Sequence, residues 1–258
     1  MAQKDFELTG RVALVVGGAT SLGRALAVAL AEAGADVAVT SCTQDKQEEA
    51  AVNSAVNEVR AIGRKGFAAA IDATDASQVD AVVQRVVDEL GGLHILVNNP
   101  DLPFAKPLAE VRDEEWQRVL AINLTAVFLA SRAAARVMLG QGKGKVINIS
   151  SLLGQGGLIN SAAYCAAKAG VIGMTRALAL EWARDGINVN CIGVGFLDDV
   201  PGIGGDEALK AALERYLPMR RLAHSQEIAG LAVYLASDAS DFVTGQAIFI
   251  EGGALSHA

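Results

Sequence analysis

Cysteine, histidine, proline and aromatic residues are all scarce in this 258-residue chain. Its three cysteines, Cys42, Cys165 and Cys191, are an odd number without CxxC spacing, which excludes a disulfide framework and a cysteine-based zinc site. The three histidines lie far apart in the sequence, so no metal site is predicted. Free thiols indicate a reducing compartment, and we expect a cytoplasmic protein.

Positive charge and membrane-targeting features are also lacking. The formal net charge is −7, which gives no electrostatic support for binding nucleic acid or an anionic membrane. The first residues contain no basic segment followed by an apolar one, so no signal peptide is expected. No uncharged apolar run reaches the length of a membrane span, so no membrane partner is predicted.

Small and apolar residues are abundant instead: 52% of the chain is hydrophobic, and 27 residues are glycine. Short apolar, β-branched runs alternate with longer Ala- and Leu-rich segments, a pattern that predicts strands alternating with helices. The predicted strands are 11–16, 36–40, 66–71, 93–97, 146–149, 187–192 and 246–250. The predicted helices are 24–33, 48–62, 76–90, 113–139, 162–182, 207–216 and 227–237.

This alternation with short connections requires a parallel sheet with helices on both faces. The predicted fold class is α/β: a single-domain, Rossmann-like, doubly wound parallel sheet that spans residues 1–258. Ligands bind such sheets in the crevice at the carboxyl ends of the strands. The residues that follow the predicted strands are therefore the candidates for a functional site.

A glycine-rich turn follows the first predicted strand and contains Gly17, Gly18 and Gly23. Such a turn lets backbone N–H groups and a helix N-terminus face a pyrophosphate, so it predicts nucleotide binding. An ordinary tight turn is the alternative.

Polar residues also follow the third and fourth predicted strands. Asp72 is placed to accept a hydrogen bond from an adenine amino group; a helix N-cap is its alternative role, although Thr74 or Asp75 fits that role better. Asn98 and Asn99 are placed to line the same crevice, although paired Asn residues are also common in loops.

Tyr164 and Lys168 are four residues apart on the predicted helix 162–182, so their side chains share one face. An ammonium beside a phenol favours the phenolate, which predicts a lowered pKa for Tyr164 and proton exchange near neutral pH. Ser151, after the strand 146–149, supplies a hydroxyl that can hold a carbonyl or alcohol oxygen. Taken alone, the pair also fits an ordinary helix aromatic beside a solvated cation.

Together these motifs resemble those of the classical short-chain dehydrogenase/reductase family over about residues 8–253, and the length and pattern resemble its 3-oxoacyl-carrier-protein reductase-like members. The stretches that carry the resemblance are Gly17-x-x-x-x-x-Gly23, Asn98-Asn99, Ile122-Asn123-Leu124, Ser151, Tyr164-x-x-x-Lys168, the run from Asn190 to Gly195, and Val243-Thr244-Gly245-Gln246 before Glu251-Gly252-Gly253.

The resemblance implies hydride transfer between a nicotinamide C4 and the carbon of a ketone or secondary alcohol, by a catalytic tetrad of Asn123, Ser151, Tyr164 and Lys168. Tyr164 would be the general acid/base and Ser151 would hold the substrate oxygen. Lys168 would lower the pKa of Tyr164 and bind the nicotinamide ribose. Asn123 would position a water that links Lys168 to solvent.

The resemblance also implies the ligand-binding residues. Those for the cofactor are Gly17, Thr20, Ser21, Leu22, Gly23, Ser41, Cys42, Asp72, Ala73, Asn98, Tyr164, Lys168 and Gly195. Those for the substrate are Ser151, Leu153, Asn160, Tyr164 and Phe196, with residues 195–217 as a glycine-containing loop expected to be mobile and to close over the ligand.

Several positions depart from the family pattern and predict weaker cofactor binding. Ser21 adds a Cβ where the backbone approaches phosphates, although its hydroxyl can contact them. Pro100 lacks an N–H group, and Asp101 places an acid near the rim of the crevice. An acid at Asp199 is unfavourable near phosphates unless it points away. The remaining departures are Val16 and Val194.

The cofactor type depends on the end of the second predicted strand, where an acid would bind the ribose 2′-hydroxyl of NAD and an Arg would favour NADP. The segment Thr40-Ser41-Cys42-Thr43 has neither. Because no acid there repels a 2′-phosphate and hydroxyls can bind one, NADP(H) is slightly favoured over NAD(H). Arg24 and Lys46 are further candidates, with a solvated surface charge as the alternative for each.

The expected substrate is a small-molecule carbonyl or alcohol, as for a carbonyl or 3-oxoacyl reductase. A sugar or polyol dehydrogenase, another reaction such as epimerisation, and a non-catalytic scaffold or nucleotide sensor of the same fold remain alternatives. Docking of an acidic carrier has thin support, since Gly142-Lys143 and Arg184-Asp185 form only a small basic patch.

The family is often tetrameric, so a homo-oligomer, tetramer or dimer, is expected. The candidate interfaces are the apolar faces of residues 120–138 and 171–182 and the strand near Phe249-Ile250. The alternative is that these faces belong to the intramolecular core.

Overall fold

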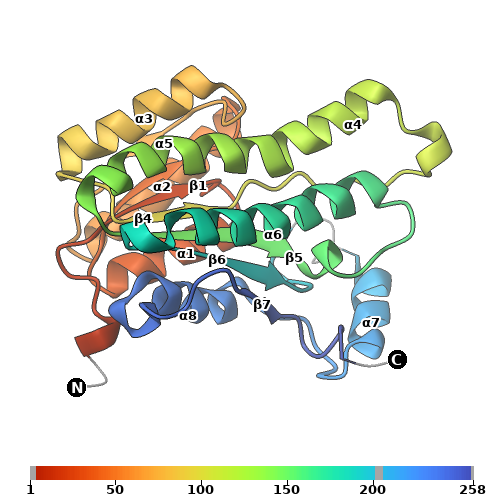
Figure 1. Cartoon of the computed structure of the whole chain (residues 1–258). Helices are drawn as coiled ribbons and strands as arrows, with labels where there is room; N and C mark the ends of the chain where they lie inside the picture. Colours follow the sequence, from red (N-terminus) through yellow and green to blue (C-terminus); the bar gives the residue numbers. More distant parts are fainter. Residues whose placement is uncertain (1–3, 201–205, 257–258) are drawn as a thin grey trace.

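A seven-stranded parallel sheet forms the centre of the molecule (Figure 1). The computed structural model describes residues 4–200 and 206–256. The strand order is β3-β2-β1-β4-β5-β6-β7, and all the described pairings are parallel. The strands are β1 (Val12–Val16), β2 (Asp36–Thr40), β3 (Ala68–Ala69), β4 (Ile95–Asn98), β5 (Gly144–Ser151), β6 (Ile187–Val194) and β7 (Ala247–Ile250).

Helices cover both faces of this sheet, as predicted (Figure 1). Alternate residues of β1 point to opposite faces: Ala13 and Val15 pack with α1, α2 and α8, whereas Leu14 and Val16 pack with α3, α5 and α6. The helices are α1 (Ser21–Glu32), α2 (Lys46–Ala61), α3 (Ala76–Leu90), α4 (Asp113–Leu120), α5 (Ala126–Gln141), α6 (Ala162–Trp182), α7 (Glu207–Tyr216) and α8 (Ser225–Ala236).

The predicted helix 113–139 is interrupted by one turn of π-helix. This turn, Ala121–Thr125, joins α4 to α5 and contains Asn123. By length and composition, Asp113–Gln141 is also the one helical run in the described residues that is apolar enough to cross a membrane. It packs instead on α3, α6 and the sheet, as the core helix of a globular protein does.

The third strand differs most from its predicted range of 66–71, because only Ala68–Ala69 is a regular strand. The chain still runs along β2 over a longer stretch. The N–H groups of Val37 and Val39 donate to the carbonyls of Lys65 and Phe67, at 2.9 and 3.0 Å. This segment lies at the sheet edge and pairs on one side only, which shortens its regular part.

Candidate active site

The predicted cofactor residues share one location, the carboxyl edge of the sheet and the first turns of α6 beside it. The strand order reverses between β1 and β4, and ligands of such sheets bind outside the strand ends at this switch point. The residues follow β1 (Gly17, Thr20, Ser21, Leu22, Gly23), β2 (Ser41, Cys42), β3 (Asp72, Ala73) and β6 (Gly195), end β4 (Asn98), or belong to α6 (Tyr164, Lys168).

The glycine turn is held in place by Asn99. Its side-chain amide donates to the Gly17 carbonyl, at 2.8 Å, and to the Thr20 hydroxyl, at 3.0 Å. The Thr20 hydroxyl in turn caps α1 by accepting from the Gly23 N–H, at 3.0 Å. Gly17 has a φ of +83°, and a Cβ there would overlap the Asn99 carbonyl. The turn is therefore compact, as an approach to phosphates requires.

Ser21 and Asp199, two of the departures from the family pattern, contact each other. The Ser21 hydroxyl donates to the backbone carbonyl of Asp199, at 2.8 Å. The Asp199 carboxylate accepts from the Ser225 hydroxyl, at 2.9 Å, and lies 3.4 Å from Nδ1 of His224. The carboxylate thus interacts with the N-terminal end of α8, and Ser21 joins the glycine turn to the loop after β6.

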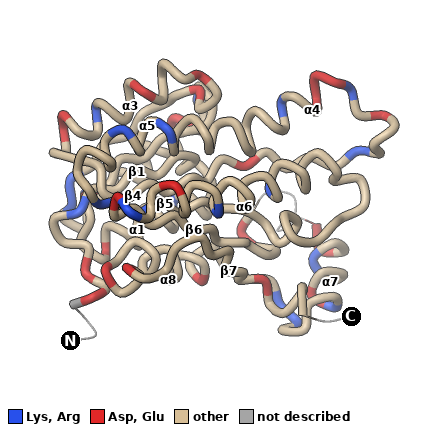
Figure 2. Tube along the Cα trace, in the orientation of Figure 1, with Lys and Arg blue, Asp and Glu red and all other residues tan. Residues whose placement is uncertain are grey.

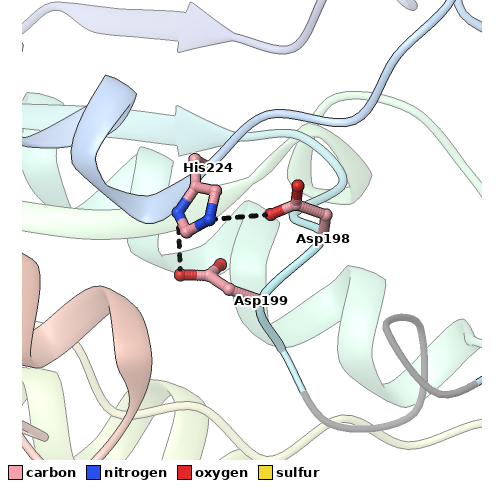
Figure 3. Close-up of side chains that lie close together, drawn as sticks. All are labelled: Asp198, Asp199 and His224. Carbon is pink, nitrogen blue, oxygen red and sulfur yellow. Dashed lines mark ion pairs between the residues drawn. The ribbon is translucent and has the colours of Figure 1, made fainter.

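Figure 3 shows His224 between two carboxylates, an arrangement that the sequence analysis did not predict. Nε2 of His224 lies 3.6 Å from Asp198, and Nδ1 faces Asp199. These three side chains are of the types that bind divalent cations, and their ligand atoms all lie within 4.8 Å of one another. The sequence did not indicate this proximity, and the prediction that the protein has no metal site stays a prediction. The contacts drawn are ion pairs between the loop after β6 and the start of α8.

A cavity of about 280 Å³ lies beside the ends of β2 and β3, where the nucleoside of a dinucleotide is expected. The Thr40 hydroxyl is buried near this end of β2 with no hydrogen-bond partner among the described residues. Asp75, and not Asp72, caps α3. Thr40 does not line the cavity, whereas the Arg118 guanidinium and several polar side chains do. The cavity is lined by Cys42, Thr43, Gln44, Asp72, Thr74, Arg118, Ala121 and Ile122.

The end of β2 does carry an acid, which corrects the prediction from its local sequence. One oxygen of the Glu48 carboxylate, on α2, accepts from the N–H groups of Cys42 and Thr43, at 2.9 and 3.0 Å. The Ser41 hydroxyl is engaged with the backbone of Ile71. Arg24 forms an ion pair with Glu58 at 2.6 Å. The sequence did not identify Glu48 because α2 brings it back to the strand end.

Tyr164 and Lys168 do lie on one face of α6, with the ammonium 5.4 Å from the centre of the phenol ring. Asp101 contacts both groups: its carboxylate accepts from the Tyr164 hydroxyl, at 2.8 Å, and lies 3.0 Å from the Lys168 ammonium. Burial and the Asp101 carboxylate raise the pKa of Tyr164 well above its usual value of 10. The prediction that Lys168 lowers the pKa of Tyr164 is therefore wrong.

The end of β5 packs against the same part of α6. The Ser150 hydroxyl donates to the backbone carbonyl of Lys168, at 2.9 Å. The Ser151 hydroxyl accepts from the Leu153 N–H, at 3.2 Å, and its hydrogen bond with Tyr164 opposes the rise in the pKa of the phenol. Ser151 thus lies beside Tyr164, as the motif predicts.

Asn123 uses its amide to hold the loop after β4. Its side chain accepts from the N–H of Leu102 and donates to the carbonyls of Leu102 and Val119, each at 3.0 Å. These bonds connect Asn123 to Leu102, the residue that follows Asp101 in the loop after β4. A water relay through Asn123 stays a prediction.

Asn98 belongs to a buried chain of polar groups that the sequence analysis did not find. Its amide donates to the hydroxyl of Ser131 and to the Asn148 side chain, at 3.0 and 2.8 Å, and Asn148 donates to Thr175, at 2.9 Å. Its own Oδ1 is buried without a partner among the described residues. A chain of this kind has no periodic pattern by which sequence could reveal it.

The predicted substrate residues surround the same edge but differ in exposure. Leu153 is buried, Phe196 is half-buried and Asn160 is exposed, with a φ of +66°. Residues 201–205 of the predicted substrate loop, 195–217, lie outside the described residues, and these include Pro201 and the glycines at 202, 204 and 205. The described part includes α7 and the loop from Gly195 to Val200.

The fold and this constellation define a class: a nucleotide-binding α/β oxidoreductase with Ser, Tyr and Lys at the edge of its sheet. The family described as Enoyl-(Acyl carrier protein) reductase matches residues 17–254. The chain belongs to the short-chain dehydrogenase/reductase family, and it is an NAD(P)-dependent oxidoreductase that acts on carbonyl and hydroxyl groups.

Relatives and solved structures agree over nearly the whole chain. The 2-dehydro-3-deoxy-D-gluconate 5-dehydrogenase of Dickeya dadantii is 36% identical over 99% of this chain and 100% of its own. The 3-oxoacyl-(acyl-carrier-protein) reductase of Vibrio cholerae is 36% identical over 95% and 98%. A gluconate 5-dehydrogenase from Burkholderia cenocepacia, solved with NADP and tartrate, is 32% identical with a TM-score of 0.92, over 100% of both chains.

Proposed function

We propose that the protein interconverts a small, freely diffusing ketone and the corresponding secondary alcohol with NADP(H), and that Tyr164 is the general acid/base. The meeting of Ser151, Tyr164 and Lys168 where β5 and α6 pack together carries this proposal. The bound nicotinamide supplies or accepts the hydride at C4. Ser151 orients the substrate oxygen, and Tyr164 gives or takes the proton on that oxygen.

The test of this role is Tyr164→Phe, with Tyr234→Phe on α8 as the matched control. Loss of the phenolic oxygen removes proton transfer, so kcat should fall by about 10²- to 10⁴-fold. Cofactor affinity should change little, as measured by quenching of intrinsic fluorescence. Turnover close to that of the original protein in Tyr164→Phe would refute the proposed role. Assays should compare polyhydroxy ketones with 3-oxoacyl thioesters.

The preference for NADP(H) is supported by the cavity at the end of β2, where Arg118 and the Thr43 hydroxyl are candidate partners for a 2′-phosphate. The solved relative from Burkholderia cenocepacia holds NADP. Glu48 opposes this preference, because its carboxylate occupies two N–H groups there.

Opposite effects are therefore expected from two substitutions at this cavity. Arg118→Ala should weaken NADPH binding about tenfold, which corresponds to about 1.4 kcal/mol, and leave NADH binding nearly unchanged. Glu48→Gln should strengthen NADPH binding. Equal losses for both cofactors in Arg118→Ala would count against the preference.

A free ketone is favoured over a carrier-bound one because the predicted basic patch is small and its Lys143 is paired with an acid. Lys143 forms an ion pair with Asp238 at 2.8 Å, and Asp238 also pairs with Arg11. Figure 2 shows Lys and Arg interspersed with Asp and Glu along α3, α4 and α7. An acidic carrier would find no extended basic surface in these parts.

We also propose a cytoplasmic homo-oligomer, a tetramer or dimer, in which α5 and α6 contribute to an interface. On these two helices the side chain of Phe128 is 42% exposed and that of Leu180 is 84% exposed. The free thiols fit a reducing compartment. Leu180→Glu should lower the mass measured by light scattering; an unchanged oligomer would remove Leu180 from the interface.

A further inference from the structure

Asp101 contacts both members of the proton-transfer pair, although the sequence marks it only as a departure from the family pattern after Asn98-Asn99. Its Oδ1 is 2.8 Å from the Tyr164 hydroxyl oxygen and 3.0 Å from the Lys168 nitrogen. The Lys168 side chain is only 2% exposed, so Asp101 is the counter-ion of a buried ammonium. No other carboxylate among the described residues pairs with Lys168.

The position of Asp101 is fixed on both sides. The carbonyl of Pro100 accepts from the Lys168 ammonium, at 3.1 Å. The N–H and carbonyl of Leu102 are both bound by the Asn123 amide, at 3.0 Å. Because both neighbours are anchored, the carboxylate is held toward Tyr164 by the fold of its loop.

We propose that Asp101 is a positioning residue of the oxidoreductase site: its carboxylate keeps the Tyr164 phenol in the protonated, donor form and neutralises the Lys168 ammonium beside it. The inference rests on the proton-transfer role proposed above for Tyr164. In carbonyl reduction the phenolic O–H bond breaks, the proton goes to the substrate oxygen, and a phenolate remains. The Asp101 carboxylate disfavours that phenolate, so the Tyr164 hydroxyl keeps its proton until a substrate carbonyl is there to accept it.

Three thiols also lie near the Tyr164, Lys168 and Asp101 group. The thiol of Cys165 adjoins Tyr164 on α6, that of Cys42 follows β2, and that of Cys191 lies on β6. Burial raises the pKa of Cys42 and of Cys191 to about 12. These two thiols are therefore uncharged at neutral pH, whereas the Asp101 carboxylate contacts both the Tyr164 hydroxyl and the Lys168 ammonium.

The experiment is an absorbance titration of tyrosinate in the cofactor-free protein, with the Tyr164→Phe curve subtracted so that one phenol is followed. Asp101→Asn should move the midpoint down by about one pH unit or more, because Lys168 then acts without its counter-ion. Asp101→Glu should restore most of the high midpoint. Asp113→Asn, an exposed acid at the start of α4, is the control and should leave the midpoint unchanged.

Activity gives a second, separate readout. In Asp101→Asn the pH profile of alcohol oxidation should shift to lower pH by the same amount, because oxidation needs the phenolate. An unshifted midpoint in Asp101→Asn, or in Asp101→Gly if the first variant does not fold, overturns the inference even when Tyr164→Phe is inactive. A shifted midpoint with an active Tyr164→Phe would instead refute the proposed role of Tyr164 alone.

Discussion

Gly17 and Gly10 are two glycines with nearly the same backbone conformation and very different surroundings. Their φ angles are +83° and +78°, in the left-handed region that disfavours other residues. A Cβ on Gly17 would overlap the Asn99 carbonyl, whereas a Cβ on Gly10 meets no described atom within 4 Å. A side chain at Gly10 would therefore meet only the conformational cost of a positive φ, whereas one at Gly17 would also crowd the cofactor turn.

Alanine at each position should therefore give unequal losses of stability. Gly10→Ala should cost about 1 kcal/mol for the positive φ alone. Gly17→Ala should cost a further 1–3 kcal/mol or so, because the Asn99 carbonyl must move. Urea unfolding measures both changes. Equal losses at the two positions would show that the turn relaxes without cost.

The sequence predicted the wrong direction for the pKa shift of Tyr164. Helical spacing correctly placed Lys168 beside Tyr164, and an ammonium alone would lower the pKa of the phenol. Burial and the Asp101 carboxylate reverse that effect. Asp101 was visible in the sequence as an acid near the crevice, but the direction of its side chain depends on anchors at Pro100 and Leu102 that no local pattern reveals.

At the scale of elements, the π-helical turn joins two parts of the site. Asn123 lies in this turn, fully buried, and its amide makes three hydrogen bonds, two of them to Leu102. A helix interior is a poor place for Asn unless its amide has such partners. The long helix thereby fixes the loop that carries Asp101.

Asn123→Ala should break this connection. The N–H of Leu102 would lose its partner, which costs about 1–3 kcal/mol in the free energy of unfolding. Asn53→Ala is the control, since Asn53 is exposed on α2 and bonds only locally to the Glu49 carbonyl. It should change stability by less than about 0.5 kcal/mol. If the two variants are equally stable, the Asn123 amide does not hold the loop.

Regular elements were the most predictable part of the chain. The bounds of β2, α3, α6 and α7 match those predicted, because each has a clear periodic pattern with Gly or capping residues at its ends. The π-turn was not predicted, since the partners of its Asn lie in a separate loop. Edge strand β3 was overestimated because its apolar residues continue beyond the regular pairing.

At the scale of the molecule, the parallel order of strands brings the predicted site residues at the ends of β1 to β6 to one edge of the sheet. Alternating strands and helices were sufficient to predict this edge, whereas most of the site residues were predicted from the resemblance to the family. Contacts between its loops were not predictable in this way. Glu48 returns from α2 to the end of β2, and His224 reaches Asp198 and Asp199 from α8. Such contacts depend on how layers pack against each other.

Stability of the whole molecule should fall in alkaline solution because of its buried thiols. The pKa of Cys191 is raised from 9.0 to about 12 by burial, and that of Cys42 by a similar amount for the same reason. Above pH 9 the unfolded chain loses these protons while the folded protein keeps them. The contribution of each thiol is therefore complete below pH 9 and is lost, by about 1.4 kcal/mol per pH unit, as the pH rises toward 12.

Cys191→Ala tests this effect, because the side chain of Cys191 is fully buried in β6. The variant should be less stable at neutral pH, since alanine leaves a small cavity. Its stability should nevertheless fall less steeply above pH 9. The difference in the free energy of unfolding between the original protein and the variant therefore narrows by about 1.4 kcal/mol per pH unit. Tyr164 and Lys145 titrate in both proteins, and their effects cancel in that difference. Urea midpoints measured at several pH values would reveal the narrowing, and a constant difference would mean that Cys191 ionises equally easily in the folded and unfolded chains.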